Sequence, residues 1–190
     1  ANDNAPGGQA AIDLLLESAK AQLAQQAFRA TIQGKDESGQ DTTVILERVQ
    51  PDRFRMISGA SEFIIVPDGT FMKEGDAEWQ QSPISMSGMM TQILSEQSIE
   101  KLIEETAPED LKFVGVDAID GEPMWIYEYT AQEDVGGTMV DTFSKTWIGV
   151  LDKLPYRVEA TSGTGDAAAS STITYEYDDS IEIEAPLVTG

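Results

Sequence analysis

The chain lacks cysteine and histidine altogether, over a length of 190 residues. It therefore has no thiolate nucleophile, no imidazole general base and neither of the side chains that build most zinc sites. This excludes Ser-His-Asp and Cys-His catalysis, and no disulfide is present to report on the redox compartment. We expect a protein that is not an enzyme, with no catalytic residues, no metal site and no cofactor.

One pattern in the chain resembles a dinucleotide-binding motif, but its position before a strand does not fit such a site. Residues 163–168 match G-x-G-x-x-A, but a dinucleotide fingerprint must open a helix, and a strand-like segment follows here instead. We interpret this stretch as the loop of a β-hairpin.

Basic residues are scarce as well. Twelve Lys and Arg stand against 34 Asp and Glu, so the net charge is −22. Phosphate backbones and anionic membrane surfaces are repelled by such a chain, which argues against a nucleic-acid partner. A solvated acidic surface keeps a protein soluble and monomeric, and we expect a monomer. Adaptation to a salty habitat, or cations gathered at the acidic surface, are alternative reasons for the acidity.

Long hydrophobic runs are also missing. No segment approaches the roughly 20 apolar residues of a membrane-spanning helix, and no leader-like segment opens the chain. Residues 1–8, ANDNAPGG, are small and polar and predict a flexible tether. The hydrophobic content of 41% is that of a globular protein, so residues 9–190 are predicted to form a single domain.

The periodicity of the remaining residues predicts an α+β fold. Apolar positions at three- and four-residue spacing predict helices over 9–26 and 86–105, the second with a break near 95–98. The first helix should bury Ile12, Leu15, Leu16, Ala19 and Leu23. Strands are predicted over 28–33, 42–49, 53–58, 62–66, 70–73, 111–119, 123–130, 139–150, 155–161 and 171–178, with Ile181–Glu184 also pairing. Because helices do not alternate with these strands, the sheet should be antiparallel. Asp68-Gly69 and Asp120-Gly121 mark hairpin turns.

The apolar residues favour a binding role. Trp125, Tyr127 and Tyr129 alternate along one face of a strand, and the second helical region is rich in methionine, whose flexible side chain suits surfaces that accept varied apolar shapes. A closed core filled by these methionines is the alternative. From the alternation of each strand, and from the apolar stripe of the second helical region, we predict a hydrophobic ligand-binding cavity. Its lining would be Phe28, Leu46, Phe54, Met56, Met89, Met90, Ile93, Trp125, Tyr127 and Trp147.

The order of these elements resembles a known family. The segments that carry the resemblance are PDRFRM, EFIIVPDGTFMKEGDAEW, DGEPMWIYEYT, TWIGVLDKLPYRVEA and TYEYDDSIEIEAP. Over residues 10–186 the chain resembles the LolA/LolB-like superfamily, and within it the LppX/LprG-type exported lipoproteins. The resemblance implies a curved antiparallel half-barrel, with helices covering its concave face and a hydrophobic cavity for acyl chains. The strand Phe54–Met56, the strand end at Trp79 and the hairpin Trp147–Arg157 would form its shell.

The resemblance also implies a function and a location. We expect an extracytoplasmic, lipoprotein-like carrier that binds the acyl chains of lipids or lipoproteins, in the periplasm or at the cell surface. Its lipid anchor would be attached through an N-terminal Cys that this chain does not contain. The partners would be a lipid or acyl chain, or a lipoprotein or membrane protein. The alternative is a non-enzymatic sensor or scaffold lipoprotein that uses the same fold to bind a protein partner.

Overall fold

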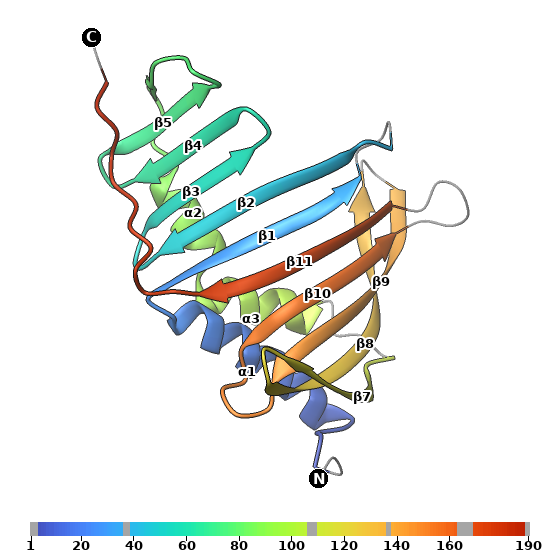
Figure 1. The fold of residues 1–190 in the computed structure, drawn as a ribbon. Coiled ribbons are helices and arrows are strands. Elements are labelled where there is room, and N and C mark those ends of the chain that lie inside the picture. The colour runs from blue at the N-terminus through green and yellow to red at the C-terminus, as the bar shows by residue number, and fades with distance from the viewer. Residues whose placement is uncertain (1–3, 36–38, 106–109, 136–137, 163–168, 189–190) are drawn as a thin grey trace. The chain divides into compact units, whose positions relative to one another are not determined.

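A computed structural model describes residues 4–35, 39–105, 110–135, 138–162 and 169–188. Within these ranges the chain forms three helices and eleven strands (Figure 1). The strands form one sheet in the order β6-β5-β4-β3-β2-β1-β11-β10-β9-β8-β7. Neighbouring strands within each hairpin pair antiparallel, so the predicted α+β class with an antiparallel sheet is confirmed. The predicted hairpin loop over 163–168 lies outside the described residues.

The elements follow the predicted order closely. Their bounds are α1 Gln9–Ala24, β1 Ala27–Lys35, β2 Asp41–Val49, β3 Arg53–Ser58, β4 Ser61–Val66, β5 Gly69–Glu74, β6 Gln80–Ser82, α2 Ser87–Ile93, α3 Glu96–Glu105, β7 Lys112–Ile119, β8 Glu122–Val135, β9 Thr138–Gly149, β10 Pro155–Ser162 and β11 Ala169–Tyr177. The predicted helix break falls at Leu94–Ser95, and the three-residue strand β6 was not predicted. In the β4–β5 hairpin the turn residues are Pro67 and Asp68, because Gly69 already pairs with Val66.

The chain divides into two compact units. Unit 1 comprises Ala1–Ala24 and Glu96–Thr174, and unit 2 comprises Gln25–Ser95 and Tyr175–Gly190. The prediction of a single domain over residues 9–190 stays a prediction.

In unit 1 the strands are packed on both faces. On one face Ala11 and Leu14 of α1 contact Tyr127 of β8 and Ile148 of β9. On the opposite face Met124, Ile126 and Trp147 form a second buried cluster, with Ile119 and Tyr156 packed against it. Both sides of this part of the sheet are therefore closed by side chains.

Two details of unit 1 differ from expectation. The buried stripe of α1 is Ala11, Leu14, Ser18 and Leu23, so apart from Leu23 it is displaced from the predicted one. Apolar residues surround this helix on more than one side, and spacing alone did not select the side that packs. In addition, the buried Tyr127 donates a 2.8 Å hydrogen bond to the carbonyl of Pro6, which fixes the chain at residue 6, within the predicted tether.

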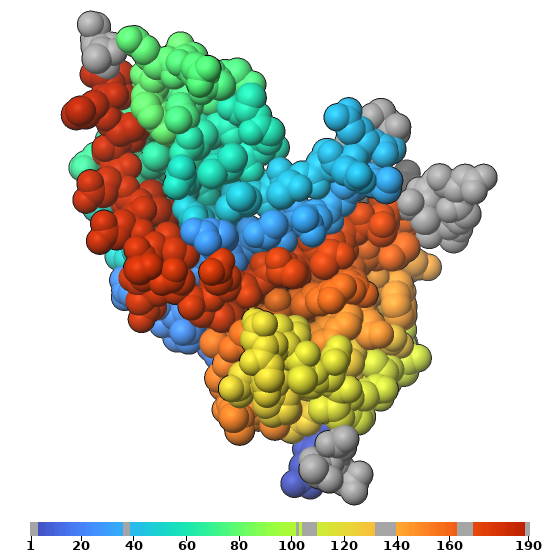
Figure 2. All heavy atoms as spheres, viewed as in Figure 1, coloured from blue at the N-terminus to red at the C-terminus, as the bar shows by residue number. Residues whose placement is uncertain are grey.

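Unit 2 buries a third cluster on one face of its strands. Ala27, Ile64, Val66 and Phe71 pack with Ile181 and Ile183 of the C-terminal segment, and Val49 and Trp79 border them. The guanidinium of Arg53 donates a 2.7 Å hydrogen bond to the carbonyl of Ile183. Figure 2 shows this segment, coloured red, lying along the strands of unit 2. The predicted pairing of Ile181–Glu184 is wrong: the alternating isoleucines pack as side chains while the backbone forms no strand.

Candidate functional site

Strand register in unit 2 arranges the side chains of one face in parallel rows. Directly opposed residues of antiparallel strands share a face, so each row can be followed from strand to strand. This face carries Thr70, whose hydroxyl accepts a 2.9 Å hydrogen bond from the backbone N–H of Met86 at the start of α2. We call it the helix face of unit 2, and the opposite side, with the C-terminal segment, its outer face.

The first row on the helix face is packed. It consists of Phe28, Arg48, Phe54, Ile65 and Thr70, all of them buried. The hydroxyl of Ser87 in α2 also donates to the carbonyl of Asp52, at 3.4 Å, so the helix is tied at two points. Phe28 contacts the rings of Tyr175 and Tyr177, with centroids 6.3 Å and 6.4 Å away. Burial lowers the pKa of the Arg48 guanidinium, because a cation is poorly solvated there.

The second row is open. It runs across four strands as Leu46, Met56, Phe63 and Met72, and we call it the apolar lane. Met56 is 38% exposed and Met72 43% exposed, while Leu46 and Phe63 are half-buried. At its β1 end the lane meets the buried Ala30, and at its β6 end Met72 is paired with Gln80. The structure thus leaves a row of four large apolar side chains partly accessible to solvent.

More apolar surface is exposed in the segment that contains α2. Ile84, Met89 and Ile93 are all exposed, and Met90 is half-buried. Exposed large apolar side chains that gather in one region are typical of binding surfaces. This segment and the apolar lane together supply five exposed large apolar residues to unit 2.

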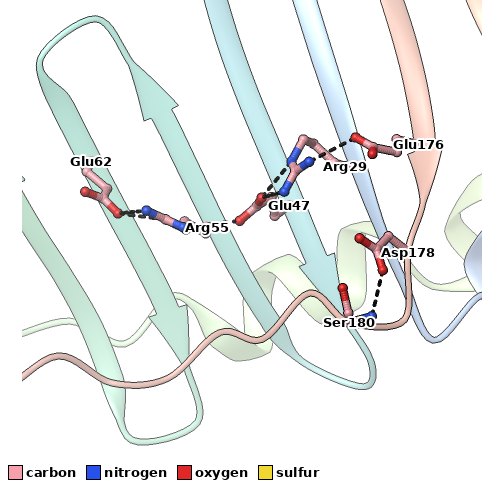
Figure 3. A network of polar contacts seen from close by, with 7 residues as sticks. All are labelled: Arg29, Glu47, Arg55, Glu62, Glu176, Asp178 and Ser180. Atoms are coloured by element: carbon pink, nitrogen blue, oxygen red, sulfur yellow. Dashed lines mark hydrogen bonds and ion pairs between the residues drawn. The ribbon is translucent and has the colours of Figure 1, made fainter.

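The outer face of unit 2 carries a ladder of alternating charges (Figure 3). Starting at β11 and ending at β5, the ladder consists of Glu176, Arg29, Glu47, Arg55, Glu62 and Lys73. Successive charged atoms lie 2.7–3.5 Å apart. The side chain of Glu47 is only 6% exposed and takes contacts from both neighbouring arginines.

Neighbouring side chains of the ladder stabilise one another's charged forms. The hydrogen bond from Arg29 to Glu47 raises the pKa of the Arg29 guanidinium. Burial raises the pKa of Glu62, but hydrogen bonds from Lys73 and Arg55 outweigh burial and leave the pKa of this carboxyl below its usual value. Lys73 also lies 4.8 Å from the ring centre of Trp79. Most basic side chains on the strands of unit 2 therefore lie on the outer face.

The structure brings together four of the residues predicted to line a cavity. Phe28, Leu46, Phe54 and Met56 share the helix face of unit 2, as their alternation predicted. Met89, Met90 and Ile93 lie on α2 of the same unit. Whether these residues contact a ligand stays a prediction.

In unit 1 the predicted set is divided. Trp125 and Tyr127 share the face that packs on α1, but Trp147 pairs with Ile126 and lies on the opposite face. The expectation that Trp147 shares a space with Trp125 and Tyr127 is therefore wrong. Its strand is apolar on both sides, so alternation did not identify the inner face. The indole N–H of Trp147 donates to Asp117 at 3.3 Å, and Lys145 and Arg157 lie near its ring.

Two residues of the lane were missed. Phe63 and Met72 lie opposite each other in the β4–β5 hairpin, and the two-residue turn after Val66 sets this register. Counting back from that turn would have paired Phe63 with Met72, and counting back from the turn at Gly59-Ala60 would have paired Phe63 with Met56. The signal was therefore present in the sequence as hairpin register.

The chain is similar to two solved structures over nearly its whole length. The lipoprotein LppX of Mycobacterium tuberculosis is 16% identical, with a TM-score of 0.64, and the match covers 94% of this chain and 100% of LppX. LprF from Mycobacterium bovis is 13% identical, with a TM-score of 0.65, and the match covers 96% and 99% of the two chains. The chain has an LppX-like fold. The resemblance to LppX-type proteins is confirmed at the level of the fold.

Comparison at the level of sequence adds nothing further. No family model and no curated protein matches the chain.

In the part of the chain that the structure describes, no three Asp or Glu side chains are grouped so that they could hold a metal ion. Over the same residues, every helix is too short or too polar to cross a membrane.

Proposed function

We propose that the protein is an extracytoplasmic carrier that binds an acyl chain of a lipid or lipoprotein along the apolar lane. The observation that supports this most directly is the lane itself, a cross-strand row of Leu46, Met56, Phe63 and Met72 that is left partly exposed beside a packed row. Apolar side chains in such a position gain free energy only when something apolar covers them. Each methylene of a covering chain contributes about 0.8 kcal/mol.

The proposed site extends beyond the lane. Phe28 and Phe54 form its packed border, and Met89, Met90 and Ile93 of α2 act as its lid. Methionine suits this role because its side chain adapts to chains of different shape. The likeness to LppX, a lipoprotein, supports a location outside the cytoplasm.

A substitution in the lane tests the proposal. Met72→Asp places a charge where the acyl chain would lie, and we expect at least tenfold weaker binding of a fluorescent fatty-acid analogue, measured by titration. Val114→Asp in β7 of unit 1 is the matched control, because Val114 is 40% exposed and lies outside the lane. Circular dichroism of both variants establishes that they are folded. Equal binding by the parent protein and both variants would place the acyl chain elsewhere.

The identity of the cargo is tested on the protein purified from its native host. Mass spectrometry of an organic extract should find co-purified lipid if the protein is a carrier. A protein that carries no lipid and binds no acyl probe would instead support the scaffold alternative, in which the exposed apolar residues contact another protein.

A further inference from the structure

We propose that the apolar lane takes an amphiphile with a cationic head group, and that Glu74 is the counter-charge of this head group. The inference rests on the proposed function, since it specifies which amphiphile the lane accepts. It follows from the residues at the β4–β5 end of the lane and from the direction in which nearby cations point.

Glu74 is held beside the lane. In the β4–β5 hairpin Glu74 pairs with Ser61, and the pair of Phe63 and Met72 lies one alternate position away on the same face. The hydroxyl of Ser61 donates a hydrogen bond to Oε2 of Glu74. This bond restrains the carboxylate on the helix face, next to the exposed Met72, while the carboxylate remains open to solvent.

The neighbouring cations lie on the opposite face. Lys73 and Arg55 both contact Glu62 of the outer-face ladder, at 2.9 Å and 2.7 Å. On the helix face this end of the lane is bordered by Ser61, Glu74 and Gln80, which supply one negative charge and no positive one. A cationic head group placed here would meet a carboxylate, the hydroxyl and amide groups beside it, and the ring of Phe63, which attracts cations.

The net charge of −22 acts in the same direction, because it raises the local concentration of cationic ligands. Arg48 would act in the opposite direction. It lies on the helix face, but it is buried in the packed row and sits on β2, about 14 Å from β5 at the usual spacing of strands. An anionic head group drawn to Arg48 is therefore the competing outcome of the test.

Three probes with the same ten-carbon alkyl chain separate these outcomes: decyltrimethylammonium, decyl glucoside and undecanoate, each below its micelle concentration. Binding is measured by displacement of the uncharged dye N-phenyl-1-naphthylamine and by calorimetry, in 150 mM salt. We expect decyltrimethylammonium to bind about threefold to fivefold more tightly than decyl glucoside, the size of an exposed ion pair, and undecanoate to bind most weakly.

Glu74→Gln should remove the preference for the cationic probe and leave the affinity for decyl glucoside unchanged. Asp68→Asn is the matched control, since Asp68 is an exposed residue of the β4–β5 turn and its loss changes the net charge equally. If Asp68→Asn reduces the preference as much as Glu74→Gln, the preference reflects net charge and the assignment of Glu74 is wrong.

The remaining outcomes distinguish this inference from the proposed function. Equal binding of all three probes, or tightest binding of undecanoate, overturns the cationic head group but leaves the acyl lane in place. If none of the probes displaces the dye and calorimetry detects no binding, the proposed function itself fails, and the inference fails with it.

Discussion

The two units stabilise their strands in different ways. In unit 1 both faces of β8 and β9 are covered, by α1 on one side and by the cluster around Met124 and Trp147 on the other. In unit 2 the outer face carries the C-terminal segment and the charge ladder, while the helix face leaves Met56 and Met72 exposed. A sheet that leaves an apolar row exposed gains little stability from that row. Unit 2 is stabilised instead by its outer face and by the packed row beside the lane.

Because of this difference, replacing a methionine by alanine should reduce stability more in unit 1 than in unit 2. Met124→Ala in unit 1 should lower the free energy of unfolding by about 3–5 kcal/mol, because Met124 is completely buried and a cavity would remain. Met72→Ala in unit 2 should cost less than about 1 kcal/mol, since nearly half of this side chain is already in water. Urea denaturation measures both. Equal losses would mean that Met72 belongs to the core, and the lane would then not be available to a ligand.

The C-terminal segment should account for the next largest effect. Ile183→Ala removes a buried side chain from the cluster on the outer face, and we expect a loss of about 2–3 kcal/mol. This lies at the lower end for such changes because a segment without strand pairing can partly close the gap. Leu187→Ala, at a residue that is 93% exposed in the same segment, is the control and should change the unfolding free energy by less than about 0.5 kcal/mol. If the two variants are equally stable, the segment does not support unit 2.

The charge ladder should contribute less than the buried isoleucine. Arg55→Met leaves Glu47 with Arg29 and Glu62 with Lys73, so the loss should be about 1–2 kcal/mol and below that of an isolated buried pair. Lys35→Met breaks an ion pair with Asp41 whose side chains are 60% and 88% exposed, and should cost less than about 0.5 kcal/mol. Binding of the acyl probe should be unchanged in both variants, because neither residue lies on the helix face. Weaker binding by Arg55→Met would show that the two faces of unit 2 are energetically coupled.

Much of this arrangement could be predicted from the sequence where a single face of a strand is apolar. Phe28, Leu46, Phe54 and Met56 were correctly assigned to one face of their strands, because their neighbours are mostly charged or small and the period of two leaves one solution. Trp147 was misplaced because its strand has apolar residues on both sides. The predicted pairing of Ile181–Glu184 was wrong because the sequence does not say whether a segment with alternating apolar residues pairs as a strand or only packs.

The ladder was not predicted for a different reason. Its members come from six strands, and only the order and register of those strands bring opposite charges into contact. A chain with 34 acidic residues offers many possible partners for each arginine. Hydrophobic alternation selects a face, but it does not select the cross-strand neighbour of a charged side chain.

The smallest expected effect concerns pH and tests whether the ladder is matched as its geometry indicates. The pKa of Glu62 in the folded protein is lowered, as hydrogen bonds from Lys73 and Arg55 outweigh burial, whereas an unfolded glutamate titrates near about 4.3. A lowered folded pKa means that the unfolded state binds the proton first, so the contribution of Glu62 to stability is present above about pH 4.3. The contribution is lost as the pH falls through the folded value.

Glu62→Gln should therefore be less stable than the parent protein at pH 6–7, and the difference should shrink steadily towards pH 3 in urea titrations. Asp68→Asn, which removes an equal charge from an exposed turn, should run parallel to the parent protein over that range. A difference for Glu62→Gln that stays constant with pH would show that the loss comes from packing, and that the ladder does not stabilise the charged form of Glu62.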